Sequence, residues 1–208
     1  NVSACFEGVL TEDRKLLKQL RRETSKMQKW SNIIVANIFK TLRLTHHDEL
    51  RDAGSYANVI SALQEITEST RDLILRCHVH TANQHSGLLP AQRRELKQVR
   101  KHVEALLHDT AHMLLNLETI AYRDVAAHYV ALKEALDDLD RNQVERIRSG
   151  ASKTRLSILF YGINNAVLKI SEQVLQLLTI FDETFNLGEK GAAAEESAPA
   201  PGRDKPGG

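Results

Sequence analysis

The amino-acid sequence predicts an all-α protein built from two tandem three-helix units, followed by a disordered C-terminal tail. Apolar residues recur at spacings of three, four and seven along most of the chain, which is the period of an α-helix. The alternating pattern typical of β-strands is absent, and long helices with short connections indicate antiparallel bundles. The same layout of helices occurs twice, which predicts one helical domain over 1–187 with pseudo-repeats at about 1–86 and 87–187.

Each of five long helices is predicted from a stripe of apolar residues on one face, and each stripe is expected to face a core. In chain order the stripes are Leu16, Leu20, Met27, Trp30, Ile34, Ile38 and Leu42; Tyr56, Val59, Leu63, Ile66, Leu73 and Cys77; Leu96, Val99, Val103, Leu106, Met113 and Leu117; Val125, Tyr129, Leu132, Leu136 and Leu139; and Leu156, Leu159, Ile163, Val167, Ile170, Val174, Leu177 and Phe181. The first ten residues, NVSACFEGVL, resemble the end of a further helix.

Glycine, proline and capping residues mark the expected helix ends. Gly54 and Gly150 lie between stripes, where helix ends favour a residue that adopts positive φ. Pro90 suits the first turn of a helix, since its missing N–H costs nothing there. Thr11, which precedes two carboxylates, supplies a capping oxygen for the first long helix.

The C-terminal residues differ in composition from the rest of the chain. From Gly188 the sequence reads GEKGAAAEESAPAPGRDKPGG, without a large apolar residue, so 188–208 are predicted to be disordered. Over the whole chain, 28 basic and 27 acidic residues are interspersed and the net charge is +1. This balance gives no sign of a nucleic-acid partner.

Several features bear on where the protein works. Cys5 and Cys77 form no pairing motif, which indicates a reducing compartment. No apolar run is long enough to cross a membrane and no signal peptide is present, so direct membrane insertion is not expected. The chain begins at Asn1 rather than at a methionine, which suggests a fragment of a longer polypeptide.

Three stretches resemble the PhoU-like domain that follows the membrane part of some bacterial inorganic phosphate transporters. They are RKLLKQLRRETSKMQKWSNIIVANIFK from Arg14, SALQEITESTRDLI from Ser61, and NQVERIRSGASKTRLSILFYGI from Asn142. The resemblance covers nearly all of 1–187 and implies a regulatory domain that modulates phosphate transport. It places the domain on the cytoplasmic side of the bacterial inner membrane, as part of an integral membrane protein.

The resemblance also implies partners. The domain is expected to contact the membrane part of the same transporter or a cytoplasmic regulatory protein, and a homodimer is a further option. A PiT-type permease is favoured over a sodium/phosphate symporter as its context. An enzyme is not expected, because the sequence lacks a P-loop, a Gly-rich dinucleotide fingerprint and a G-x-S-x-G motif.

A metal site is the alternative function. PhoU proteins carry an acidic E-x-x-x-D motif on the third helix of each unit, which binds clusters of transition metals. The resemblance carries this motif onto Glu68 and Asp72, with Glu65 one turn earlier on the same face. These carboxylates form either a solvated face or an iron or zinc site of a metal-binding helical sensor. In the second half Asn164 and Asn165 replace the acids, so the usual pair of metal clusters is not expected.

Three further patterns are weaker candidates for a binding site or an interface. Glu104, His108 and His112 recur every four residues, as in a partial zinc or iron ligand set or simply an exposed face. A basic run beside the start of the last helix is a candidate anion site; it comprises Arg141, Arg146, Arg148, Lys153 and Arg155. The last helix is also apolar on its second side, which predicts an interface outside its own unit; this side carries Ile158, Tyr161 and Leu168.

Overall fold

The computed structural model describes residues 1–44, 50–85, 87–116 and 122–196, and within these ranges it contains six α-helices and no strand. The helices are α1 (Val2–Leu10), α2 (Arg14–Leu44), α3 (Leu50–Ala82), α4 (Pro90–Asn116), α5 (Tyr122–Arg148) and α6 (Thr154–Glu196). The all-α prediction is therefore confirmed. Helix α6 includes the start of the predicted tail, and residues 197–208 lie outside the described residues.

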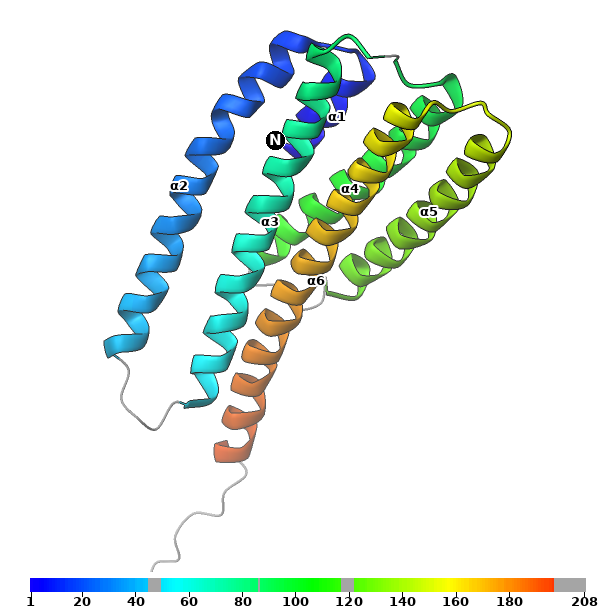
Figure 1. Cartoon of the computed structure of the whole chain (residues 1–208). Coiled ribbons are helices and arrows are strands. Elements are labelled where there is room, and N and C mark those ends of the chain that lie inside the picture. The colour runs from blue at the N-terminus through cyan, green and yellow to red at the C-terminus, as the bar shows by residue number, and fades with distance from the viewer. Residues whose placement is uncertain (45–49, 86, 117–121, 197–208) are drawn as a thin grey trace, which may run out of the picture.

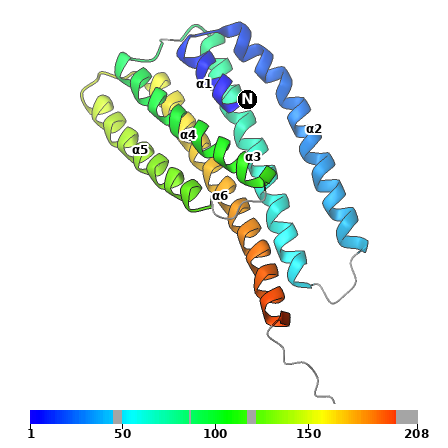
Figure 2. The same cartoon turned by 180° about the vertical axis from the view of Figure 1, so that it is seen from behind.

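Two three-helix units are present, as the sequence predicts. Helices α1, α2 and α3 contact one another, and so do α4, α5 and α6. The two units meet mainly along α3 and α6, which make the most extensive contact of any helix pair and lie side by side in Figure 1 and Figure 2. The two helices run in opposite directions. The pseudo-repeat relation between 1–86 and 87–187 stays a prediction.

A single hydrophobic core joins all six helices. Its largest fully buried side chains are Phe6 from α1, Leu17 from α2, Leu73 and Ile74 from α3, Leu96 and Leu106 from α4, Leu132 from α5, and Phe160, Ile163, Ile170 and Leu178 from α6. Because α3 and α6 each contact the helices of their own unit and one another, both are covered on more than one side. Among the described residues, no helix combines the length and the apolarity that crossing a bilayer requires.

The apolar stripe of α2 is buried only along its first part. Leu20 belongs to the core, but Trp30 and Ile34 are 66% and 44% exposed, so the prediction that the whole stripe faces the core is wrong. The reason is the length of the neighbouring helices: α1 has 9 residues and α2 has 31. Beyond the reach of α1, the helix that packs on α2 among the described residues is α3. The side chains of Ile38 and Leu42 lie outside the described residues.

Three of the expected helix ends need comment. Gly150 has a φ of 71° after α5, as predicted, and Pro90 is the first residue of α4. Gly54 lies inside α3 rather than at its end, because α3 already begins at Leu50.

The capping of α2 also differs from the prediction. Thr11 belongs to the end of α1, where its Oγ1 donates to the carbonyl oxygen of Glu7 at 2.7 Å. The cap of α2 is Asp13, whose Oδ1 accepts hydrogen bonds from two backbone N–H groups of the first turn at 2.9 and 3.0 Å.

Candidate functional site

The surface along the line where α3 meets α6 contains two adjoining hollows. The larger, of about 530 Å³, is lined by the acidic residues of α3 and by the first half of α6. The smaller, of about 360 Å³, is more apolar and lies where α3 ends and α6 begins. Arg76 and Ile158 line both hollows, so the two form one continuous surface, which we call the α3–α6 groove.

The acidic stripe predicted on α3 faces this groove. Glu65, Glu68 and Asp72 all line the larger hollow, which confirms that they share one face of the helix. Across the groove, Lys169 of α6 donates from Nζ to Oε1 of Glu65 at 3.0 Å. This ion pair, with help from the hydroxyl of Ser69, lowers the pKa of the Glu65 carboxyl.

The three carboxylates do not form a ligand set in this arrangement. Among the described residues, no group of three or more His, Cys, Asp or Glu side chains is placed to hold a metal ion. Glu65 is neutralised by Lys169, and Asp72 pairs with its neighbour Arg71 at 3.6 Å. Because these two carboxylates already pair with basic side chains, the arrangement disfavours a metal cluster and favours the alternative of a solvated face. The iron or zinc site at Glu65, Glu68 and Asp72 stays a prediction.

Arg76 does not pair with Asp72, although it lies one turn further along α3. Its side chain packs across the groove on α6, where a Cβ added at Gly162 would lie 3.0 Å from Cδ of Arg76. The absence of a side chain at position 162 therefore makes room for Arg76. The guanidinium group remains at the surface, between the acidic and the apolar ends of the groove.

The two asparagines of the second unit have different environments. Asn164 is buried and donates from Nδ2 to Oδ1 of Asp140 at 2.9 Å, so it supports the packing of α6 on α5. Asn165 is exposed and lines the groove opposite the acidic stripe. Only one of the two residues at the motif position therefore contributes to the groove.

The end of the groove near the start of α6 is apolar and uncovered. Leu75, Val79 and Ile158 line it and are 40%, 44% and 59% exposed. The second apolar side of α6 thus divides into two parts. Leu168 is half-buried and packs against the core, whereas Ile158 contributes an open surface.

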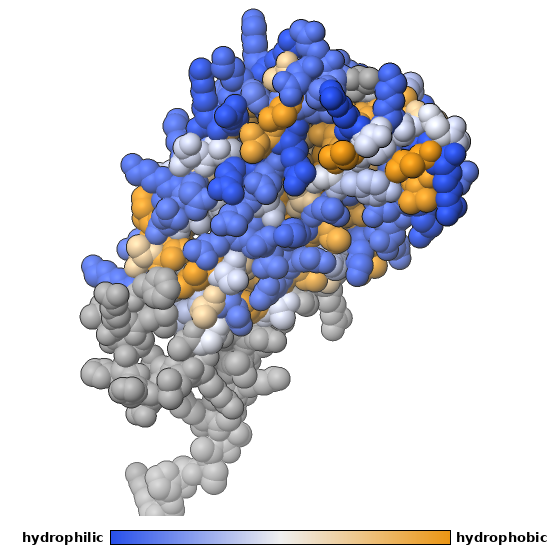
Figure 3. All heavy atoms as spheres, viewed as in Figure 1, coloured by the Kyte–Doolittle hydropathy of each residue, from blue (hydrophilic) through white to orange (hydrophobic). Residues whose placement is uncertain are grey.

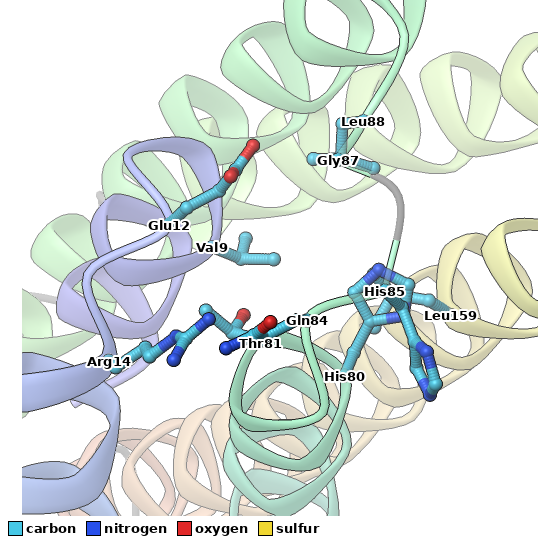
Figure 4. A pocket seen from close by; sticks show the side chains of 10 residues that line it. All are labelled: Val9, Glu12, Arg14, His80, Thr81, Gln84, His85, Gly87, Leu88 and Leu159. Carbon is cyan, nitrogen blue, oxygen red and sulfur yellow. The ribbon is translucent and has the colours of Figure 1, made fainter.

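A third hollow, of about 220 Å³ and mostly polar, adjoins the apolar end of the groove (Figure 4). Glu12 and Gln84 line it, and both have positive φ angles, 57° and 54°. Such angles are costly for residues other than glycine. Here they end α1 and α3 in tight turns, closed by hydrogen bonds of 2.8 Å from Asp13 N–H to the Gly8 carbonyl and 3.3 Å from His85 N–H to the His80 carbonyl. Sequence patterns gave no sign of these turns, since neither position is a glycine or an asparagine.

The histidine stripe on α4 does not assemble into a metal site. Glu104 accepts a hydrogen bond from Ser3 of α1 and another, at 2.8 Å, from Arg100, and these contacts lower the pKa of its carboxyl. His108 and His112 stack with their ring centroids 6.5 Å apart. The carboxylate thus fastens α1 to α4 and the imidazoles lie beside one another on the surface.

Two of the five residues of the basic run near the start of α6 form ion pairs. Arg146 forms two hydrogen bonds with the carboxylate of Glu95, at 2.9 and 2.8 Å, and its guanidinium lies 5.2 Å from the ring centroid of Phe160. Arg141 pairs with Asp138. These contacts occupy two of the five basic residues, and the anion site stays a prediction.

The chain was compared with known proteins both in sequence and in structure. No family model matches the chain, and no curated protein matches it in sequence. The structure of PhoU from Pseudomonas aeruginosa matches with a TM-score of 0.76 and 12% identity, over 89% of this chain and 88% of that one. The structure of the phosphate transport system regulatory protein PhoU from Streptococcus pneumoniae matches with a TM-score of 0.71 and 12% identity, over 88% of this chain and 86% of that one. The likeness shows that the chain has the all-α fold of PhoU proteins.

Proposed function

We propose that this chain is a regulatory domain of inorganic phosphate transport, and that it acts by contact with a transporter on the cytoplasmic side of the bacterial inner membrane. The observation that carries the proposal is the PhoU-like fold, which extends over 89% of the chain. One of the matched structures is that of a phosphate transport system regulatory protein. Within this proposal, the finer assignment is to a domain of the transporter polypeptide itself, with the membrane part or a cytoplasmic regulatory protein as its partner.

The exposed apolar side chains support a role in protein contact. Six of the nine large apolar side chains that are exposed among the described residues lie at the open end of the α3–α6 groove or on the distal part of α2, where Trp30, Ile33 and Ile34 are 66%, 41% and 44% exposed. The other three lie on α5: Val130, Val144 and Ile147. Clustered apolar side chains at the surface are typical of surfaces that bind another protein. We propose that these surfaces, rather than a catalytic site, carry the function.

Phosphate uptake by cells tests the proposal. The complete polypeptide that contains this chain is produced in a bacterium that lacks its own phosphate transporters, with and without residues 1–187, and uptake of radioactive phosphate is followed at low and high external phosphate. We expect removal of the domain to change the uptake rate or its response to external phosphate. Removal of 197–208 alone serves as the control and should leave uptake unchanged. Identical uptake with and without 1–187 would overturn the proposal.

A further inference from the structure

We propose that the outer face of α2 binds a lipid surface that contains anionic headgroups, with the helix lying along that surface. This inference goes beyond the proposed function and holds whether or not the chain regulates phosphate transport. Two observations carry it: the charge of α2 is almost entirely of one sign, and the distal part of the helix exposes a tryptophan and two isoleucines.

The balanced charge of the whole chain conceals an uneven distribution. Helix α2 has nine basic residues and one acidic residue, a net charge of +8. Since the whole chain has 28 basic and 27 acidic residues, the remainder has 19 and 26, a net charge of −7. The single carboxylate of α2, that of Glu23, accepts a hydrogen bond from Gln19 at 3.0 Å. Positive charge is therefore concentrated on one helix, where it attracts an anionic partner.

Lysines lie on both sides of the exposed apolar side chains, on the same face of the helix. Lys26 precedes Trp30 by four residues and Lys29 precedes Ile33 by four, so each lysine is one turn away from an apolar side chain. Lys40 follows Ile33 by seven residues, which is two turns. All five side chains are exposed. The outer face of α2 thus has an apolar centre with basic groups before and after it.

The basic side chains of α2 are not neutralised by carboxylates of the chain. The ion pairs among the described residues involve the other helices and Glu12, and none includes a lysine or an arginine of α2. The phosphates of lipid headgroups can therefore accept hydrogen bonds from these groups without breaking an existing ion pair.

The arrangement favours a bilayer over an acidic protein. A bilayer presents negative headgroups above an apolar layer, and basic helices that expose tryptophan and aliphatic side chains lie at this boundary. Helix α2 is at an outer edge of the molecule in Figure 1 and Figure 2, and Figure 3 shows hydrophobic residues among hydrophilic ones on this side. None of the three hollows described above is lined by its distal part. A flat surface covers such a protruding edge without a cavity.

Vesicle binding tests the proposal. The chain is mixed with vesicles of phosphatidylcholine alone, or of equal parts phosphatidylcholine and phosphatidylglycerol, and bound protein is measured by sedimentation. We expect binding to the mixed vesicles, much weaker binding to phosphatidylcholine alone, and loss of binding as salt is added, because salt screens exposed charges. On binding, the emission of Trp30, the single tryptophan, should shift to shorter wavelength and its quenching by acrylamide should decrease.

Matched variants locate the contact. Lys26→Gln combined with Lys29→Gln removes two positive charges from the outer face of α2 and should weaken binding to the mixed vesicles by about tenfold or more. Lys97→Gln combined with Lys101→Gln removes the same charge from exposed positions of α4. This control should bind nearly as tightly as the wild type, because the net charge of the two double variants is equal and only its position differs.

The apolar contribution is tested separately. Ile33→Ser should weaken binding and reduce the shift of the Trp30 emission, whereas Ile147→Ser, at a position 45% exposed on α5, should do neither. Circular dichroism establishes that every variant remains helical. Absence of binding to the mixed vesicles overturns the proposal, and so does binding that the α2 variants leave unchanged. Binding to polyglutamate without binding to vesicles also overturns it, and assigns this face to an acidic protein instead.

Discussion

At the scale of single residues, His78 of α3 has a buried ring nitrogen, Nδ1, without a hydrogen-bond partner among the described residues. Burial of the ring, together with the positive charges of Arg21 and Lys18, lowers the pKa of His78 below its ordinary value of 6.5. The folded protein therefore keeps this imidazole neutral at a pH at which the unfolded chain already binds a proton. Protonation of His78 is therefore less favourable in the folded protein than in the unfolded chain.

This difference predicts how stability depends on pH. A pKa that is lowered by folding contributes stability above the unfolded pKa of about 6.5, and the contribution is lost as the pH falls through the folded-state value. We therefore expect the free energy of unfolding to decrease below about pH 6.5, and to decrease less steeply in the His78→Gln variant. Urea unfolding of both proteins at several pH values measures the two slopes. Equal slopes would contradict the assignment to His78.

The helical spacing of apolar residues predicted most of the buried apolar side chains, but it did not predict the buried polar ones. Gln92 and Gln143 are both fully buried, and Nε2 of Gln92 donates to Oε1 of Gln143 at 2.9 Å. Nε2 of Gln143 donates in turn to the hydroxyl groups of Ser152 and Ser157, at 3.0 and 2.9 Å. A hydropathy pattern assigns glutamine to the surface, because the partners that satisfy a buried amide come from other helices and are invisible to local spacing.

At the scale of helices, the sequence predicted the long elements well, because each has a stripe of period 3.6 over several turns. It was less informative about the ends. Asp13 caps α2 where Thr11 was expected, since both residue types can accept the same hydrogen bonds and only the backbone decides between them. It also could not show how far α2 is covered, because this depends on the length of its neighbours.

The close packing of α1 on α2 gives an element-scale prediction. A Cβ added at Gly8 would lie 2.7 Å from Cγ of Leu17, which is fully buried. The two helices can therefore pack this closely because Gly8 has no side chain. We expect Gly8→Ala to lower the free energy of unfolding by about 1–3 kcal/mol. The matched control is Gly54→Ala in α3, where nothing lies within 4 Å of an added Cβ.

This control should have the opposite sign. Alanine restricts the unfolded chain more than glycine does, so Gly54→Ala should stabilise α3 by about 0.5–1 kcal/mol. Thermal and urea unfolding of the two variants measure both effects. Equal destabilisation by the two substitutions would show that the approach of α1 to α2 is less close than the packing at Gly8 indicates.

The acidic stripe of α3 provides a second test at this scale. Because Lys169 neutralises Glu65 and the other two carboxylates remain at the surface, we expect purified protein to bind neither iron nor zinc in stoichiometric amount. Replacing Glu65, Glu68 and Asp72 together by alanine should change stability by well under ~1 kcal/mol per residue. Elemental analysis of protein prepared without chelator, and thermal unfolding with added metal, are the measurements. Bound metal that disappears in the triple variant would favour the sensor hypothesis instead.

At the scale of the whole molecule, the groove arises from the meeting of helices that are distant in sequence. The ion pair between Glu65 and Lys169 joins residues separated by 104 positions. The sequence showed which face of α3 is acidic and that α6 is apolar on two sides, but it did not show that these faces adjoin. That information resides in the packing of one three-helix unit on the other, which local patterns do not encode.

The single tryptophan reports on whether the exposed apolar part of α2 lies in water. Trp30 is 66% exposed on α2, a helix that packs on α1 and α3 and lies at an outer edge of the molecule in Figure 1 and Figure 2. We therefore expect the emission maximum of Trp30 to be that of an indole in water, and acrylamide to quench its fluorescence strongly at every protein concentration. If instead quenching decreases as the protein concentration rises, and Ile33→Glu prevents the decrease, the distal part of α2 is covered by a second copy of the chain.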